Sequence, residues 1–255
     1  MRELLKLQLR VLGALVLRET RATFGTSRLG YLWAIITPAF GVAIFVAVFA
    51  AAGRRAPFGS SLALFFATGF LTLEFFRKLS TSLMTTFNAN KALLTYPVIK
   101  EADTLFARHI LITATYLVIM VVFYGTLIAF GLASFPARPG QLLLAFGAVS
   151  LLGFGFGSLN AVLISKWESW QYIESILTRP LIFISAVFYV PSGLPSKAAS
   201  VLSWNPVLHL VEWTRVAYYT DYNSYILDKT IPVAVGMVLV LVGLIGERLY
   251  RKKRV

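Results

Sequence analysis

Apolar residues are concentrated in six long stretches of the chain, and most charged residues fall in the segments between them. A helix of about 20 mostly apolar residues is long enough to cross a hydrocarbon core of about 30 Å. The pattern therefore predicts six transmembrane helices, at 30–52, 57–76, 110–133, 141–165, 174–190 and 230–246. We expect an all-α integral membrane protein with a single transmembrane domain over 1–255.

The segment before the first of these stretches has a helical periodicity of its own. Over 2–21, apolar and basic residues recur so that each kind gathers on one side of a helix. The apolar side carries Leu5, Leu9, Leu12 and Val16, and the opposite side carries Arg2, Lys6 and Arg10. The pattern predicts that 1–29 forms a basic amphipathic helix in the membrane surface. Such a helix is either a simple anchor or a cuff around a cytoplasmic entrance.

The segment 77–109 predicts a cytoplasmic loop that contains a short helix. Asn88 is suited to cap that helix, because its side chain can accept a hydrogen bond from a free amide of the first turn. Pro97 would end it after Thr95, since the residue before a proline avoids helical geometry. Such a helix offers a surface to a partner protein, and an ordinary connecting loop is the alternative. The candidate contact residues are Asn88, Asn90, Lys91, Tyr96, Pro97 and Lys100.

The segment 191–229 predicts two short helices on the opposite side of the membrane, over 196–202 and 206–219. Pro206 suits a first helical position, and Glu212 and Arg215 are spaced to pair on one helix. The second helix is apolar enough to dip into the membrane, which is tolerated where protein or a water-filled cavity satisfies its backbone. We expect a re-entrant segment at the outer end of a pathway, and an interfacial helix is the alternative.

Three glycines at alternate positions mark the stretch 141–165. Gly153 and Gly157 lie four residues apart, and therefore on one face of a helix, with Gly155 between them. Small residues let two helices approach closely in lipid, where the hydrophobic effect does not drive helices together. The spacing predicts a close helix–helix contact, and a hinge or a pore-lining role is the alternative.

The net charge of +13 is informative through its distribution. With six spans, 18 of the 24 basic residues fall on the side that holds both termini. Cytoplasmic segments of membrane proteins carry the excess of Lys and Arg, so both termini are expected in the cytoplasm. The basic residues of 247–255 then form a cytoplasmic anchor after the last span, and no nucleic-acid partner is expected.

Residues for catalysis are scarce in this sequence. It has no cysteine, no P-loop to hold ATP, and two histidines that fall on opposite sides in the expected topology. The acidic residues lie at span ends or in loops, whereas a proton relay needs an ionisable group deep in the bilayer. We expect no catalytic residue, metal or cofactor in this chain.

Aromatic residues of the first two spans either pack the core or present flat rings to a sliding sugar polymer; they include Trp33, Phe65, Phe66 and Phe70.

Two runs of residues resemble segments of polysaccharide-exporting ABC transporter permeases. The first is LRETRATFG at 17–25, followed by SRLGYLWAI at 27–35, and the second is WNPVLHLVE at 204–212 with Arg215 after it. The run 90–102 is similar to the coupling loop of that family, and the length and the six-span layout agree as well. The likeness covers essentially the whole chain and is greatest to the capsular-polysaccharide export permeases of Gram-negative bacteria.

The resemblance implies an assembly and a role for particular residues. Such permeases are homodimers in the inner membrane, and each copy engages an ATP-binding cassette subunit that uses ATP and Mg. A lipid-linked capsular polysaccharide would pass through a canal between the two copies, lined by spans one, two and five, toward a periplasmic adaptor and an outer-membrane channel. The loop residues around 88–100 would couple to the ATPase. The entrance and canal would include Arg21, Phe24, Arg28, Trp33, Phe65, Phe66 and Phe70, and the periplasmic gate Trp204, Asn205, Pro206, Glu212 and Arg215.

Other substrates and one other function stay open at this point. Related permeases for O-antigen or teichoic acid share the same layout. A membrane-embedded transferase acting on lipid-linked sugars is a more remote alternative. It would need clustered acids or a metal site at the membrane face, and the sequence offers neither.

Overall fold

The computed structural model describes residues 2–25, 28–96 and 99–252, and the regular structure within these ranges is helical. The predicted all-α class is confirmed. The long helices are α1 (Arg2–Phe24), α2 (Arg28–Ala51), α3 (Leu62–Met84), α5 (Glu101–Ala129), α6 (Pro139–Ile164) and α11 (Thr230–Lys252). The short ones are α4 (Thr86–Ala89), α7 (Trp170–Thr178), α8 (Leu181–Ile184), α9 (Ser196–Leu202) and α10 (Pro206–Tyr218).

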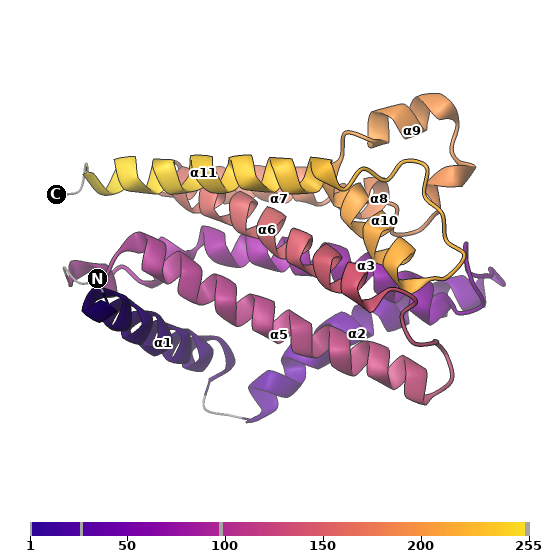
Figure 1. The fold of residues 1–255 in the computed structure, drawn as a ribbon, viewed down its shortest axis with the longest axis horizontal. Helices are drawn as coiled ribbons and strands as arrows, with labels where there is room; N and C mark the ends of the chain where they lie inside the picture. The colour runs from indigo at the N-terminus through magenta and orange to yellow at the C-terminus, as the bar shows by residue number, and fades with distance from the viewer. Residues whose placement is uncertain (1, 26–27, 97–98, 253–255) are drawn as a thin grey trace.

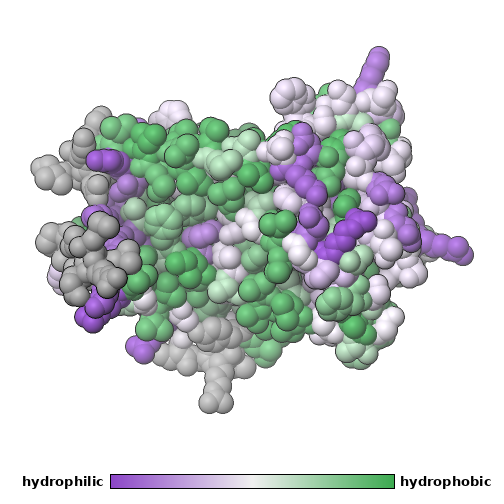
Figure 2. Space-filling view, in the orientation of Figure 1, coloured by the Kyte–Doolittle hydropathy of each residue, from purple (hydrophilic) through white to green (hydrophobic). Residues whose placement is uncertain are grey.

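The long helices form an elongated bundle with both chain termini at one end (Figure 1). We call this the terminal end, and we call the opposite end, which carries α9 and α10, the α9 end. Among the described helices, α2, α5, α6 and α11 are long and apolar enough to span a bilayer. Hydrophobic side chains gather over the middle of the face shown in Figure 2, and hydrophilic side chains gather toward its two ends. This is the surface expected of a membrane-spanning bundle.

α3 is the central helix and is buried along most of its length. It packs against α2, α5, α6 and α10. It covers most of the predicted span 57–76, but it begins at Leu62, where Ser61 Oγ accepts a hydrogen bond from the Leu64 amide (3.2 Å). It then continues to Met84, beyond the predicted end, because the charged residues that follow 76 are good helix formers.

The predicted fifth span, 174–190, does not form one continuous helix. α7 ends at Thr178, Pro180 follows, and α8 has only four residues. Proline removes a backbone donor and clashes with the preceding turn, and Ala186 then adopts a left-handed φ of 59°. The nine residues of α7 are about 13 Å long, too short to cross a bilayer core of about 30 Å. The prediction is therefore corrected to a broken helix whose continuation at Ala186 and Val187 is fully buried in the bundle.

The glycines of α6 allow close contacts on two opposite faces. A Cβ atom at Gly153 or Gly157 would lie within 2.8 Å of leucine side chains on α3. A Cβ atom at Gly155 would lie 2.8 Å from the backbone carbonyl of Gly236 on α11. The predicted close packing is confirmed, and it involves two partner helices rather than one.

The segment 77–109 is mostly helical rather than a loop. α3 extends into it, and α5 begins at Glu101, well before the predicted position 110. Asp103, in the first turn of α5, stabilises the start of this helix, because its Oδ2 accepts a hydrogen bond from the Lys100 amide (3.0 Å). α4 and a 3-10 turn over Leu93–Thr95 lie between the two long helices.

Two predictions about this segment have different outcomes. Asn88 lies within α4, whose N-terminal residue follows Thr85, so the prediction that Asn88 caps a helix is wrong. Pro97, the predicted end of that helix, lies outside the described residues.

Candidate functional site

A buried carboxylate joins four helices at the terminal end. Glu19 on α1 is 2% exposed, and its Oε2 accepts hydrogen bonds from Nε and Nη2 of Arg108 on α5, both at 2.8 Å. Its Oε1 accepts a hydrogen bond from Asn90 Nδ2, just after α4 (3.0 Å). Arg108 Nη1 also donates to the Ser82 carbonyl of α3 (3.0 Å), and Arg18 donates to Asn90 Oδ1. We call Glu19, Asn90 and Arg108 the Glu19 cluster.

The Glu19 cluster makes α1 part of the bundle rather than a separate surface helix. A carboxylate out of water is stable only when charged donors saturate it, as Arg108 and Asn90 do here. Nearer the N-terminus, Gln8 Nε2 on α1 also donates to Asp103 Oδ1 on α5 (2.5 Å). These contacts tie α1 to α5 and to the loop after α4.

The side of α1 that packs on the bundle coincides only in part with the predicted apolar side, on which Leu12 and Val16 are half-buried. Leu15 and Glu19 are buried, and both lie beside the predicted apolar stripe rather than on it. Leu9, on the stripe, is 61% exposed, and Arg10 on the basic side is exposed. The helix therefore has a basic side, an apolar side and a side bound to α5. The side chains of Arg2 and Leu5, also in that prediction, lie outside the described residues.

The predicted partner-binding residues lie mainly on the surface of the terminal end. Asn88, Lys91, Tyr96 and Lys100 are exposed. Asn90 is 1% exposed because its amide is used in the Glu19 cluster. Asn90 can therefore position this surface, but it cannot itself contact a partner.

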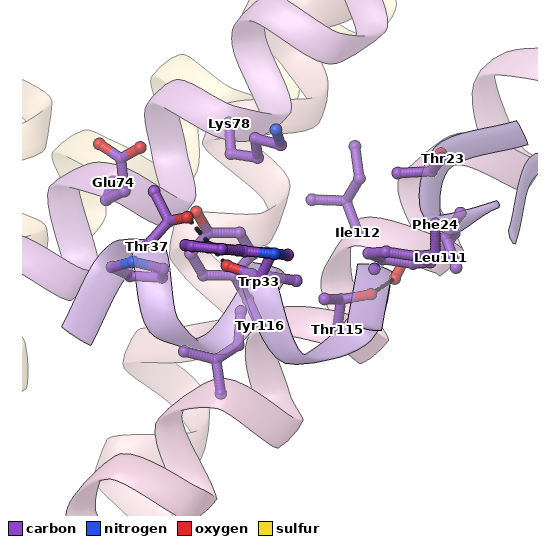
Figure 3. Close-up of a pocket in the computed structure, with 14 residues that line it drawn as sticks. Thr23, Phe24, Trp33, Thr37, Glu74, Lys78, Leu111, Ile112, Thr115 and Tyr116 are labelled. Atoms are coloured by element: carbon purple, nitrogen blue, oxygen red, sulfur yellow. Dashed lines mark hydrogen bonds between the residues drawn. The ribbon is translucent and has the colours of Figure 1, made fainter. Parts of the chain in front are cut away.

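A cavity of about 270 Å³ lies where α1 ends and α2 begins (Figure 3). We call it the α1–α2 cavity. Phe24 and Trp33, both predicted entrance residues, line it together with side chains of α3 and α5. Arg21 is exposed and is not among its lining residues. The side chain of Arg28 lies outside the described residues.

The phenylalanines predicted to face a canal are packed inside the chain. Phe65 and Phe66 are 0% exposed. The Phe66 ring packs against Phe45 and Phe49 of α2, with ring centroids 5.9 and 4.8 Å apart, and against Phe188 at 6.2 Å. Phe70 is only partly buried and belongs to the same core. These rings stabilise the α2–α3 contact, because α2 and the broken segment after α8 cover them.

A fully buried ion pair organises the α9 end. Arg215 and Glu212 on α10 are 0% and 1% exposed, with Arg215 Nη1 3.3 Å from Glu212 Oε1. Tyr222 donates its hydroxyl to both oxygens of Glu212, at 2.8 and 2.9 Å. Arg215 donates to the backbone carbonyls of Tyr189 (3.1 Å) and Val187 (3.3 Å). We call Glu212, Arg215 and Tyr222 the Arg215 cluster; it confirms the predicted Glu212–Arg215 pair.

The Arg215 cluster explains how the broken helix survives inside the bundle. Irregular backbone exposes carbonyl groups that have no helical partner, and leaving them unsatisfied is costly in an apolar surrounding. The Arg215 guanidinium supplies the donors for two of them and lies over the Phe65 ring, 4.0 Å from its centroid. One side chain thus joins α10, the segment after α8 and α3.

The other predicted gate residues start α10. Asn205 caps the helix, because its Oδ1 accepts a hydrogen bond from the Val207 amide (3.0 Å), and Pro206 occupies the first helical position. Asn205 Nδ2 also donates to the Ile184 carbonyl (3.1 Å) at the end of α8. Trp204 is 84% exposed and points away from this packing. The bounds predicted for α9 and α10 are confirmed to within one residue.

A third polar cluster was not predicted, and it attaches α7 to the bundle. Ser80 Oγ on α3 donates to Glu174 Oε1 on α7 (3.0 Å), and Asn160 Nδ2 on α6 donates to Ser80 Oγ (2.9 Å). Trp170 Nε1 donates to Asn160 Oδ1 (3.0 Å). Glu174, like Glu212, is buried inside the bundle, which its expected place at a span end did not indicate.

The buried polar residues that the sequence did not predict were missed for one reason. Glu19 and Arg108 are 89 positions apart, and Ser80 and Glu174 are 94 positions apart, so no local spacing connects them. One signal was available, since Glu19 lies in the run at 17–25 that carries the family resemblance. Within the described ranges, no three His, Cys, Asp or Glu side chains are placed to hold a metal ion.

Comparisons with known proteins give matches over most of the chain. The family model for ABC-2 type transporters matches residues 10–219. The polysialic acid transport protein KpsM of Escherichia coli is 31% identical, over 94% of this chain and 92% of its own length. The capsule polysaccharide export inner-membrane protein BexB of Haemophilus influenzae is 25% identical, over 97% and 94%. The O-antigen export system permease protein RfbA of Klebsiella pneumoniae is a weaker match, at 22% over 89% and 86%.

Proposed function

The chain belongs to the ABC-2 type transporter family, and from this premise we propose that it is the membrane subunit of an ATP-driven exporter of a lipid-linked capsular polysaccharide. The observation that carries the proposal is the 31% identity to KpsM across nearly the whole chain. The lower identity to RfbA makes O-antigen the second choice of substrate. The chain itself is a permease subunit, and ATP and Mg belong to a separate ATP-binding subunit.

We infer that two copies of the chain assemble with two ATP-binding subunits. In this arrangement the terminal end faces the cytoplasm, because the positive-inside rule favours the side with the excess of basic residues. The exposed residues Lys91, Tyr96 and Lys100 then contact the ATP-binding subunit. The Glu19 cluster lies directly behind this surface, so it would carry a displacement of the loop to α1.

The transport path in this proposal runs between the two copies. The α1–α2 cavity lies beside the cytoplasmic entrance, and α10 with the Arg215 cluster forms the outer gate. Aromatic side chains that remain exposed on the described chain are candidates to face the canal; Trp33 is 63%, Phe40 65% and Phe183 67% exposed. A periplasmic adaptor and an outer-membrane channel would receive the polymer from this gate.

Complementation tests the substrate. The chain and its own ATP-binding subunit are expressed together in an Escherichia coli strain that lacks KpsM and in a Klebsiella pneumoniae strain that lacks RfbA. We expect capsule to return to the surface of the first strain and O-antigen not to return in the second. The reverse outcome would transfer the proposal to O-antigen. Rescue of neither strain, by a pair that fails to co-purify, would overturn the exporter proposal.

A further inference from the structure

The α1–α2 cavity has a charged end and an apolar end. Its lining includes Glu74 and Lys78 of α3 beside the aromatic rings of Trp33 and Tyr116. A second cavity of about 270 Å³ follows it between α2 and α5, and its walls are apolar apart from Thr115. Four residues line both cavities, so the two form one continuous crevice; the shared residues are Ala34, Leu111, Thr115 and Ile119.

Lys78 supplies the free charge at the polar end. Its side chain is exposed and makes no hydrogen bond or ion pair with a residue that the structure describes. Glu74 does not neutralise it, since its carboxylate points away from the Lys78 amino group (Figure 3) and lies 3.9 Å from Arg77. Two of the three threonine hydroxyls that line the cavity are already committed as donors: Thr37 donates to the Trp33 carbonyl and Thr115 to the Leu111 carbonyl, both at 2.8 Å.

The apolar end opens at the exposed surface between α2 and α5, where a bilayer would meet two candidate spans. Val118 on its wall is 54% exposed, and both α2 and α5 are candidate membrane spans. A lysine that extends its aliphatic stem along apolar walls and keeps its ammonium at the membrane surface is suited to an anionic group at that depth. The ligand that matches such a crevice has an anionic head and a hydrocarbon tail in continuity.

We propose that this crevice binds a lipid with a phosphate headgroup, with the phosphate at the Lys78 ammonium and one acyl chain in the groove between α2 and α5. The phosphate accepts charge-assisted hydrogen bonds from Lys78, and the acyl chain covers Ala114, Val118 and Ile35. A bilayer phospholipid and the lipid end of the exported glycan share this chemistry. Only the second source rests on the proposed function.

Photolabelling of the purified permease–ATPase complex in nanodiscs tests the site. Phosphatidylglycerol with a diazirine in one acyl chain is compared with a diacylglycerol that carries the same diazirine and has no phosphate. We expect about tenfold more labelling of α2 and α5 peptides by the phosphatidylglycerol probe, as one charge-assisted hydrogen bond predicts. Lys78→Gln should remove that preference, and Ala114→Phe, which fills the groove, should lower labelling by both probes.

Two matched variants separate the crevice from general lipid contact. Lys166→Gln removes an exposed lysine outside the crevice, and Gly125→Phe enters a different lipid-facing cavity between α5 and α6. Both should label like the unaltered complex. Equal labelling by the two probes, or labelling that neither Lys78→Gln nor Ala114→Phe changes, would overturn the proposal.

The source of the lipid is decided by competition. Lipid-linked glycan extracted from the capsule-producing strain is added before irradiation. A fall in labelling assigns the crevice to the lipid end of the cargo, and unchanged labelling assigns it to a bilayer phospholipid; both outcomes keep the phosphate-lipid site. Because labelling needs no transport, failure of the exporter proposal would leave this measurement interpretable.

Discussion

The Glu19 cluster and the Arg215 cluster both pair a buried carboxylate with an arginine, at opposite ends of the molecule. Glu212 and Arg215 are three residues apart on one short helix and are 1% and 0% exposed. Glu19 and Arg108 belong to two helices 89 positions apart, and the Arg108 side chain is 13% exposed. The first pair is local and sealed, whereas the second is long-range and reaches the surface.

This difference indicates that the Arg215 cluster stabilises the local fold, whereas the Glu19 cluster connects separate helices. Arg215 supplies donors to backbone carbonyls that a broken helix leaves inside the bundle, so without it the local fold has unsatisfied groups. Glu19 and Arg108 connect helices that are each complete without the contact. The Arg215 cluster should therefore govern stability, and the Glu19 cluster should govern communication between α1 and the loop after α4.

The largest effect is expected from Arg215→Ala. The variant leaves Glu212 buried without its counter-charge and two carbonyls without donors, and breaking a buried pair in this way costs about 3–5 kcal/mol of unfolding free energy. The measurement is thermal unfolding of the purified chain in detergent. The control is Arg138→Ala, which removes an exposed arginine that also donates to a backbone carbonyl, that of Val216 (3.0 Å). Equal melting temperatures of Arg215→Ala and the unaltered chain would show that the Arg215 cluster does not stabilise the fold.

Glu19→Gln should act mainly on coupling. Loss of charge-assisted hydrogen bonds costs about 1.5–3 kcal/mol at the junction of α1 and α5, so melting should change less than in Arg215→Ala. Polymer export, and the change of ATPase rate on complex formation, should fall. Glu168→Gln, at an exposed glutamate, is the control. The exchange Glu19→Arg with Arg108→Glu should restore part of the coupling, and a large loss of stability in Glu19→Gln alone would erase the contrast between the clusters.

Charge reversal at the surface in front of the Glu19 cluster comes next. Lys91 and Lys100 are exposed, so Lys91→Glu and Lys100→Glu should leave melting unchanged and weaken the ATPase response through repulsion at the contact. The same reversal at Lys197 on α9 should alter neither quantity, because that residue lies at the opposite end. Normal coupling in both loop variants would show that the partner contact is elsewhere.

The smallest effect is expected at the start of α11. Asp228 Oδ1 accepts hydrogen bonds from the Thr230 amide (2.8 Å) and hydroxyl (2.6 Å), which lower the pKa of Asp228 below its ordinary value of 3.8. A carboxyl whose pKa is lowered by folding contributes stability above its unfolded pKa and loses it as pH falls through the folded pKa. Asp228→Asn should melt slightly lower than the unaltered chain at pH 7, and the difference should shrink as the pH falls below about 4 and vanish below the folded pKa of Asp228. A difference in melting that does not depend on pH would show that the charge of Asp228 is not its cause.

The two clusters also show which contacts can be predicted from the sequence and which cannot. The Glu212–Arg215 pair follows from spacing on a helix that Pro206 starts, and the structure has both. No spacing reports the pair of Glu19 with Arg108, or the contact of Ser80 with Glu174. Asn90 was predicted on a partner surface from its place in a loop, yet a contact with a distant helix takes it inside.

The amino-acid sequence by itself determined the helical class, the apolar stretches, the bounds of α9 and α10, and the close packing at the glycines of α6. Each rests on periodicity, capping or residue size within one segment. The tertiary structure alone decided that Phe65 and Phe66 face the core, that α1 packs through Leu15 and Glu19, and that the chain at 185–187, after α8, is buried. In a membrane protein, a face that meets lipid and a face that meets another helix are equally apolar, so periodicity finds the face but not what covers it. Long-range donors, such as the Arg215 guanidinium for Val187, then determine which irregular backbone the bundle can contain.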